Sequence, residues 1–290
     1  MAKLRIKKSN HALNRSFGGD MAINVILLIF GAFMFIPMFY TIIQSFKPLD
    51  ELWVFPPRFF VVNPTFKNYG SLLRLMSTSW VPFSRYIFNT VFLSVAGTAG
   101  NLFFSSVAAY AISKVKFPGS GGTFRLIRMT LMFHATVTTI TNFYTMSLLG
   151  WVDTYLALII PAFASTMGLY LMKQFMDNNV PDELIEASRI DGANEFNCYW
   201  RIAMPIIKPA WLTLIILAFQ GLWNMGASIY IQSEQLKTFP YAIGQIVSSG
   251  IARMGASMAS NVILLIVPIT VFIINQSNII ETMASSGMKD

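Results

Sequence analysis

Six long stretches of this sequence carry no charged side chain and consist mostly of apolar residues. A helix rises about 1.5 Å per residue, so about 20 residues cross a hydrocarbon core of roughly 30 Å. Each stretch is close to that length or longer, and a chain of 290 residues could not surround six such helices with polar structure. We therefore predict an all-α integral membrane protein with six transmembrane helices, at residues 21–46, 86–113, 129–150, 154–172, 209–233 and 254–280.

The distribution of Lys and Arg predicts the orientation of this six-span domain, residues 21–280. Six spans place both ends of the chain on one side, which carries 14 of the 21 basic residues, against 7 on the other side. Basic residues favour the cytoplasmic side, so we expect the basic tail 1–20 and the C-terminal tail 281–290 to be cytoplasmic. The net charge of +8 then reflects topology and contact with membrane lipid, and we expect no nucleic-acid partner.

Residues 177–205 form a long polar segment on the predicted cytoplasmic side. Pro181 suits the start of a helix, and Gly192 can adopt the left-handed conformation that ends one. Beyond it, apolar residues recur at helical spacing, namely Phe196, Tyr199, Trp200 and Ala203. We expect two short helices joined by a glycine turn, lying against the inner face of the membrane. The segment alone could also be an amphipathic hairpin that only rests on the membrane surface.

Three clusters in this segment resemble the cytoplasmic coupling motif of binding-protein-dependent ABC importers. They are Glu186-Ala187-Ser188, Asp191-Gly192-Ala193 and Ile202-Ala203-Met204-Pro205. The family motif runs Glu-Ala-Ala, three residues to Gly, then on to Ile-x-Leu-Pro, so Ser188 replaces the second Ala and Met204 replaces Leu. The resemblance implies a coupling helix pair that docks on an ATPase through Glu186, Ala187, Ser188, Asp191, Gly192, Ala193, Ile202 and Pro205.

Further segments resemble the shorter permease subunit of maltose-type sugar importers. They are residues 63–69, Asn89-Thr90, 108–111, 117–119 and Trp223-Asn224. Residues 238–244 resemble the external loop that probes the solute-binding protein in this family. The resemblance implies the type I ABC importer fold, and it assigns contact with the binding protein to Thr238, Phe239, Pro240, Tyr241 and Gly244.

Polar and aromatic residues within the predicted spans are candidates for the substrate path, because sugars are bound by amides, hydroxyls and stacked rings. The candidates are Asn142, Tyr144, Gln220, Trp223, Asn224 and Asn261. A buried amide costs energy unless it is paired, so these residues either face a cavity or bond to a neighbouring helix.

The sequence contains no phosphate-binding pattern GxxxxGK[ST], because the glycine-rich residues 119–122 lack the lysine. We expect no catalytic residue and no cofactor in this chain, with ATP and Mg²⁺ bound by partner ATPase subunits. Two histidines and the single Cys198 do not suggest a metal site. His134, inside the third predicted span, is a candidate for a transport role because it is ionisable.

The resemblance implies a transmembrane permease in a bacterial plasma membrane that imports sugars or oligosaccharides. The implied partners are a second homologous permease, two ATPase subunits and an extracellular solute-binding protein. One alternative is a permease of the same architecture for another small solute. A second is a channel or an ion-coupled secondary carrier, although such carriers commonly have inverted repeats and interrupted helices, neither of which is evident.

Overall fold

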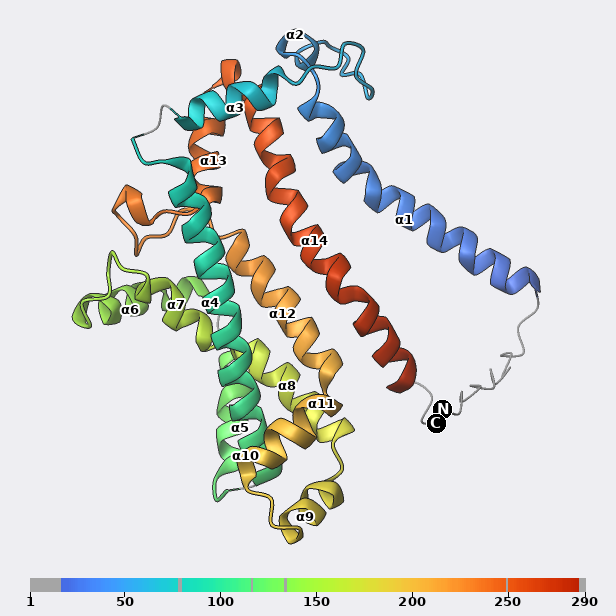
Figure 1. Ribbon diagram of the computed structural model, residues 1–290, viewed down its shortest axis with the longest axis vertical. Coiled ribbons are helices and arrows are strands. Elements are labelled where there is room, and N and C mark those ends of the chain that lie inside the picture. The colour runs from blue at the N-terminus through green and yellow to red at the C-terminus, as the bar shows by residue number, and fades with distance from the viewer. Residues whose placement is uncertain (1–16, 78–79, 116, 133–134, 249, 287–290) are drawn as a thin grey trace, which may run out of the picture.

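The regular secondary structure in the described part of the chain is all helical (Figure 1). The computed structural model describes residues 17–77, 80–115, 117–132, 135–248 and 250–286. His134 and residues 1–16 and 287–290 of the predicted tails lie outside this part. The first half of the chain contains α1 (Phe17–Ser45), α2 (Leu49–Leu52), α3 (Lys67–Ser77), α4 (Phe83–Tyr110), the π-helical η1 (Ala111–Val115), α5 (Ser120–Thr130) and α6 (Ala135–Leu148).

The second half of the chain contains the remaining helices. They are α7 (Leu156–Phe163), α8 (Thr166–Asn179), α9 (Asp182–Ile190), α10 (Glu195–Asn197), the π-helical η2 (Cys198–Ala203), α11 (Met204–Ile206), α12 (Lys208–Trp223), the 3₁₀-helical η3 (Glu234–Leu236), α13 (Phe239–Ser248), the 3₁₀-helical η4 (Ile251–Arg253) and α14 (Met254–Ser286).

Four helical segments in the described part are long and apolar enough to cross a membrane, namely Met21–Ser45, Phe83–Val115, Leu156–Asn179 and Met254–Asn275. Counting Glu195–Ile206 and Lys208–Trp223 as one bent crossing, with an 82° bend, makes five. The predicted third span, 129–150, covers the end of α5 and the short α6. The predicted fifth span, 209–233, covers α12 and then the non-helical residues 224–233. The chain is an all-helical membrane protein, and the count of six spans stays a prediction.

Helix α4 is the central element, and α7, α8 and α12 pack around it. Two of its glycines permit this packing. A Cβ on Gly100 would lie 1.9 Å from Cε1 of Phe163 on α7, and a Cβ on Gly97 would lie 2.5 Å from Cδ1 of Leu222 on α12. Small residues allow helices to approach closely, which matters in lipid because no hydrophobic driving force holds helices together there and packing must do so.

The segment from α7 to α8 is one apolar stretch that breaks at residues 164–165. Pro161 and the break leave backbone carbonyls of α7 without their usual helical partners. The Asn101 amide of α4 donates to the Ala162 carbonyl at 2.8 Å, and the Ser165 hydroxyl accepts from the Gly168 amide at 2.9 Å. Interrupted backbone at membrane depth needs such partners, and here α4 supplies one of them.

Helix α1 leaves the rest of the molecule along most of its length (Figure 1). It contacts α14 near its Ser45 end and diverges towards its other end. Its apolar side chains are consequently open, with Leu28 72% and Met34 74% exposed. The buried apolar clusters instead lie along α4, one with α8, the hairpin region and α12, one with α7, and one with α3, α13 and α14.

A compact cap follows α1 and is held by buried polar side chains. Lys47 donates to the Arg58 carbonyl at 2.5 Å, and Glu51 accepts from the Val62 amide at 2.6 Å. The Asn68 amide donates to the carbonyls of Ser45 at 2.8 Å and Lys47 at 2.7 Å. These bonds fix the segment between α1 and α4 at one end of the molecule, opposite α9 (Figure 1).

Candidate functional site

The segment 177–205 contains two helices joined at a glycine turn. Helix α9 starts after Pro181 and ends before Gly192, whose φ of +83° is the left-handed conformation that favours glycine. The Asn194 side chain then accepts from the Asn197 amide at 2.8 Å and starts the second helix. This helix continues to Ile206 and bends sharply into α12.

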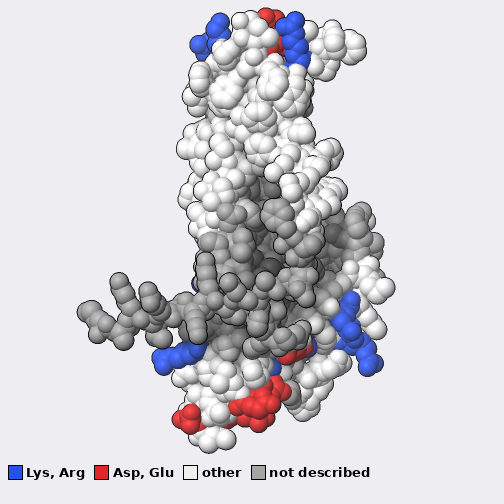
Figure 2. All heavy atoms as spheres, turned by 90° about the vertical axis from the view of Figure 1, so that its right-hand side faces the viewer, with Lys and Arg blue, Asp and Glu red and all other residues white. Residues whose placement is uncertain are grey.

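The hairpin formed by α9 and the helix 195–206 exposes a mixed charged and apolar surface. The exposed large apolar side chains are Leu184, Ile190, Phe196, Trp200 and Ile206, and Ile190 is 86% exposed. Glu186, Ala187, Asp191, Gly192 and Pro205 are also exposed, whereas Ser188, Ala193 and Ile202 are half-buried. Acidic side chains gather at this end of the molecule (Figure 2). Apolar residues among charges, at the tip of a protruding hairpin, are typical of a docking surface.

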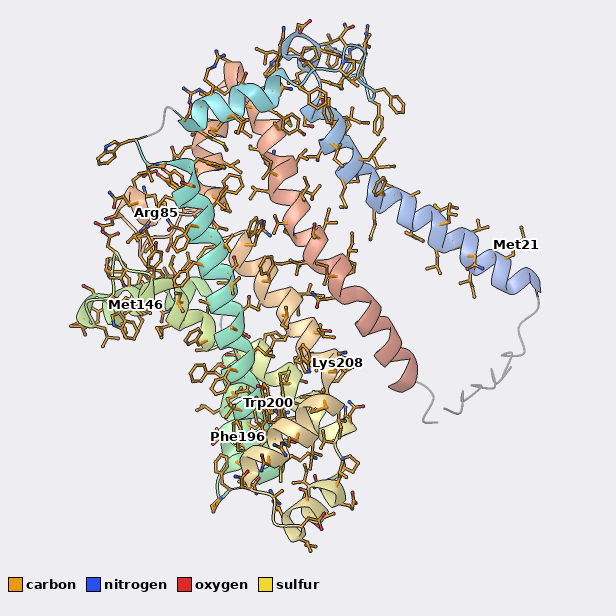
Figure 3. The ribbon with its side chains drawn as sticks, viewed as in Figure 1. Met21, Arg85, Met146, Phe196, Trp200 and Lys208 are labelled. Carbon is orange, nitrogen blue, oxygen red and sulfur yellow. The ribbon has the colours of Figure 1, made fainter. Side chains whose placement is uncertain are left out.

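The apolar stripe expected on the second helix of the hairpin divides into two faces. Tyr199 and Ala203 are buried, and the Tyr199 hydroxyl lies 2.7 Å from the hydroxyl of Ser106 on α4. Phe196 and Trp200 lie on the exposed side, near the end of α4 opposite Arg85 (Figure 3). Half of the stripe thus anchors the hairpin, and the other half is presented outward.

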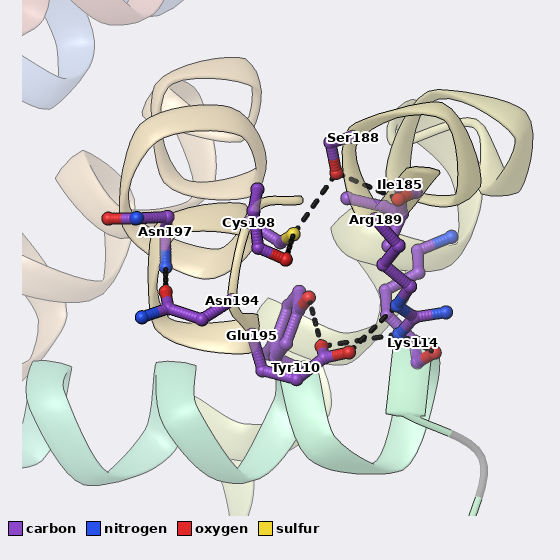
Figure 4. Close-up of polar contacts among 10 residues, drawn as sticks. Tyr110, Lys114, Ile185, Ser188, Arg189, Asn194, Glu195, Asn197 and Cys198 are labelled. Carbon is purple, nitrogen blue, oxygen red and sulfur yellow. Dashed lines mark hydrogen bonds and ion pairs between the residues drawn. The ribbon is translucent and has the colours of Figure 1, made fainter. Parts of the chain in front are cut away.

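Small side chains hold the two helices of the hairpin close together (Figure 4). The Ser188 hydroxyl donates to the Ile185 carbonyl at 2.7 Å and lies 3.0 Å from the Cys198 sulfur. Cys198 is fully buried. Ser188 therefore contributes to the internal packing of the hairpin, where a longer side chain would separate α9 from η2.

The last turn of α4 and η1 bind both helices of the hairpin (Figure 4). The Tyr110 hydroxyl donates to Glu195 at 2.8 Å, and Glu195 pairs with Arg189 at 2.7 Å. Lys114 donates to the Val180 carbonyl and to Asp182, both at 2.6 Å. The foot of α4 thereby joins the end of α8, the start of α9 and the start of the second helix.

The charge on Glu195 is stabilised by its neighbours. The hydrogen bond from Arg189 holds the pKa of the Glu195 carboxyl below its ordinary value, against the opposing effect of burial, and the Tyr110 hydroxyl adds to the lowering. The same hydrogen bond raises the pKa of Arg189. Both groups therefore stay ionised at neutral pH, and the pair remains attractive there.

The segment 238–244 begins with side chains that point inward. Thr238 and Phe239 are buried, with the Thr238 hydroxyl bonded to the Met225 carbonyl at 2.6 Å and the Phe239 ring packed on Phe83. Pro240 and Tyr241 are half-buried, and Gly244 is exposed. The more open part of this region is the turn just before it, where Gln232, Ser233 and Gln235 are exposed. Thr238 and Phe239 thus hold this turn in place.

Three of the six residues predicted for a substrate path line one cavity. Gln220, Asn224 and Asn261 border a cavity of about 350 Å³ between α12 and α14, together with apolar residues of α14. Trp223 is buried, and its indole donates to the Leu264 carbonyl at 3.2 Å, so it connects the two helices.

Asn142 and Tyr144 lie apart from that cavity. Both are on α6, which extends to one side of α4, and both are exposed. Among the described residues, no group of three or more His, Cys, Asp or Glu side chains is placed to hold a metal ion. Of the six predicted residues, Gln220, Asn224 and Asn261 are therefore the ones that share a cavity.

The contacts at the foot of α4 were not predicted from the sequence. Tyr110, Ser113 and Lys114 follow at helical spacing i, i+3 and i+4, which places them on one side of a helix. That spacing was a usable signal that the end of a span carries a polar face. It does not say which segment this face contacts, because the partners lie 64 to 85 residues further along the chain.

Comparison with known proteins identifies the family, although no family model matches the chain. The chain is 30% identical over 251 residues to the polygalacturonan/rhamnogalacturonan transport system permease YtcP of Bacillus subtilis, covering 85% of this chain and 84% of YtcP. It superimposes, with a TM-score of 0.75 and 25% identity, on a chain in the crystal structure of a bacterial ABC transporter that imports the acidic polysaccharide alginate. That match covers 91% of this chain and 98% of the other.

The chain belongs to the carbohydrate-uptake family of ABC-importer permeases. This permease is also 24% identical to the arabinooligosaccharide permease AraQ of Bacillus subtilis, over 93% of this chain and 95% of AraQ. It is 29% identical to the sn-glycerol-3-phosphate permease UgpE of Yersinia enterocolitica, over 93% of this chain and 97% of UgpE. These relatives are permease proteins of transport systems, as their names state.

Proposed function

We propose that this permease imports an uncharged sugar or oligosaccharide and that the hairpin 177–205 docks on a separate ATPase subunit. The observation that carries the docking is the exposed surface of the hairpin. Ile190, Phe196 and Trp200 stand open beside the carboxylates of Glu186 and Asp191, while Tyr110 and Lys114 fasten the base of the hairpin to a membrane-spanning helix. A rigid projection with an apolar tip is suited to fit a groove and to transmit its movement.

The proposed solute follows from the cavity between α12 and α14. Gln220, Asn224 and Asn261 can donate to and accept from hydroxyl groups, and the rest of the lining is apolar. No charged side chain occurs in this lining. A phosphate ester, the solute in the name of the relative UgpE, would call for a cationic partner, so the lining favours a neutral sugar.

The proposed assembly contains a second permease, two ATPase subunits and an extracellular binding protein. The divergence of α1 supports the second permease, because a helix that leaves its own subunit can pack on a neighbour in the membrane. ATP and Mg²⁺ would bind to the ATPase subunits. The proposed orientation places α9 and both tails in the cytoplasm, and the turn 232–235 outside, where it would meet the binding protein together with Tyr241 and Gly244.

Purification from native membranes tests the proposal. An ATPase and a second permease should copurify with this chain, and a bifunctional cross-linker at Ala187→Cys should capture the ATPase. The only native thiol, Cys198, is buried and will not compete for the reagent. If Ala187→Cys is cross-linked only to lipid or to other segments of this chain, the proposed docking of the hairpin on an ATPase is refuted.

Substitution of Gly192 tests the hairpin as a mechanical element. Proline requires a φ near −65°, far from the observed +83°, and it removes the amide that donates to the Arg189 carbonyl at 3.0 Å. Gly192→Pro should leave the protein inserted in the membrane but abolish uptake. Asparagine tolerates the left-handed conformation, so Gly192→Asn is the matched control and should retain most uptake. Equal uptake by the two variants would refute the assignment.

A further inference from the structure

One helix connects the two regions to which the proposed function assigns contacts with other subunits. Helix α4 continues into η1 without a break, and together they span the 33 residues Phe83–Val115. At about 1.5 Å per residue this rod is roughly 50 Å long, which is enough to cross a membrane and project at both faces.

The outer end of α4 is bonded to the turn and helix at 234–239. The Asn89 amide donates to the carbonyls of Gln235 and Lys237, both at 2.8 Å, and Asn89 is fully buried. The Tyr86 hydroxyl donates to Glu234 at 2.8 Å. The Thr90 hydroxyl accepts from the Phe239 amide at 2.7 Å. Three side chains on one side of α4 therefore fix this turn to the helix.

The inner end of the rod is bonded to the hairpin, and to the end of α8 that leads into it, in a similar way. Tyr110 donates to Glu195 at 2.8 Å, Ser113 donates to Asp177 at 2.5 Å, and Lys114 reaches Val180 and Asp182. The rod thus carries a tyrosine near each end whose hydroxyl binds a glutamate of the attached segment, Glu234 outside and Glu195 inside.

The middle of α4 has few specific bonds to its neighbours. Ser94, Thr98 and Ser105 are buried on α4, and their hydroxyls have no hydrogen-bond partner among the described residues. Asn101 makes one bond, to the Ala162 carbonyl. The middle of the helix is held mainly by packing against α7, α8 and α12, so the specific side-chain bonds of α4 to distant segments are concentrated towards its two ends.

We propose that α4 is a strut that transmits movement between the ATPase-docking hairpin and the external turn 232–239. Asn89 and Tyr110 are its positioning residues, because each ties an attached segment to the rod without meeting solute or nucleotide. The proposal rests on the proposed function and goes beyond it, since the docking could operate without any direct connection to the external turn. Two sites are coupled only if both bias the same structural change, and a single rigid helix bonded at both ends provides such a change.

The test measures the response of the external turn to nucleotide in the purified complex. Gln235→Cys places a thiol on the exposed turn, and its backbone carbonyl can still accept from Asn89. The rate at which a maleimide labels this thiol is measured with and without a non-hydrolysable ATP analogue and Mg²⁺. We expect the analogue to change this rate, and we expect Asn89→Ala to remove the change although the ATPase still copurifies.

Asn68→Ala is the matched control. Asn68 is also buried, and its amide also donates to two backbone carbonyls at 2.7 and 2.8 Å, but it belongs to α3 and not to the rod. Asn68→Ala should therefore keep the nucleotide response. If Asn68→Ala removes the response as completely as Asn89→Ala does, or if neither removes it, the strut is refuted.

A variant at the inner end completes the test. Tyr110→Phe deletes one hydroxyl about 30 Å along the helix from Asn89, and it should weaken the response at Gln235→Cys. An unchanged response would overturn the proposal. If Asn89→Ala fails to assemble, Tyr86→Phe replaces it, because it removes only the bond to Glu234. Failure of the ATPase to copurify with the unaltered chain would instead refute the proposed function, so the two failures are distinguishable.

Discussion

Replacement of Lys114 by methionine is expected to loosen the hairpin without unfolding the protein. The Lys114 side chain is 4% exposed, and its ammonium group donates to the Val180 carbonyl and to Asp182, both at 2.6 Å. A hydrogen bond from a charged donor contributes about 1.5–3 kcal/mol. The pair with Asp182 adds about 0.2–1 kcal/mol, because Asp182 is 42% exposed and water can replace its partner.

Methionine has a similar length and carries no ammonium group that must be desolvated, so it recovers part of this loss. A net cost of about 2 kcal/mol corresponds to a roughly 30-fold larger population of hairpins released from α4. Hydrogen exchange measures this population directly, because amides of α9 exchange when the hairpin opens. Backbone amides of residues 183–190 should exchange faster in Lys114→Met, while those in the middle of α4 should be unchanged.

Lys173→Met is the control for this experiment. Lys173 pairs with Asp177 one turn further along α8, so this variant also removes a lysine from an acidic partner near the hairpin. Pairs of this i, i+4 kind contribute about 0.3–0.5 kcal/mol, so exchange in α9 should hardly change. Unchanged exchange in Lys114→Met, or equal acceleration in both variants, would show that Lys114 does not hold the hairpin.

Three further predictions concern packing, solute and pH. Gly100→Ala should lower thermal stability by about 1–3 kcal/mol because its Cβ would overlap Phe163, whereas Gly221→Ala, which meets nothing within 4 Å, should not. Asn261→Leu should reduce uptake of the sugar captured by the cognate binding protein, and Asn142→Leu on the exposed α6 should not; the opposite order would remove the cavity from the path. The pKa of the Glu195 carboxyl is lowered in the folded protein, so Glu195 contributes stability that is fully present above its ordinary pKa and is lost as pH falls through the lowered pKa. Thermal melts of wild type and Glu195→Gln should therefore differ by a constant amount between about pH 5 and 8, and the difference should shrink as pH falls below the ordinary glutamate pKa of about 4.3.

The sequence by itself determined the class of the protein and the local form of the hairpin. Long apolar stretches without charges indicate segments that lie in lipid. A helix is the form they take there, because it bonds every backbone polar group within its own segment. The turn at Gly192 could likewise be predicted, because a left-handed turn depends on residues next to each other in the chain. The cap by Asn194 is equally local, although it was first seen in the structure. The family was also predicted from short motifs, whose residues are close together in the sequence, and the comparisons confirmed it.

Only the tertiary structure decided which side chains meet. Gln220, Asn224 and Asn261 share a cavity, whereas Asn142 and Tyr144, which are also polar residues within a predicted span, lie elsewhere on α6. The partners of the rod are equally distant in sequence, since Asn89 binds the carbonyl of a residue 146 positions away.

Contacts between helices could not be predicted because local sequence patterns and tertiary packing act over different distances along the chain. Helical periodicity specifies which residues share a face, but the contact of one face with another depends on how all the helices pack. Phe196, Tyr199, Trp200 and Ala203 illustrate the difference, because one apolar stripe in the sequence became an anchored half and an exposed half once α4 occupied one side of the hairpin.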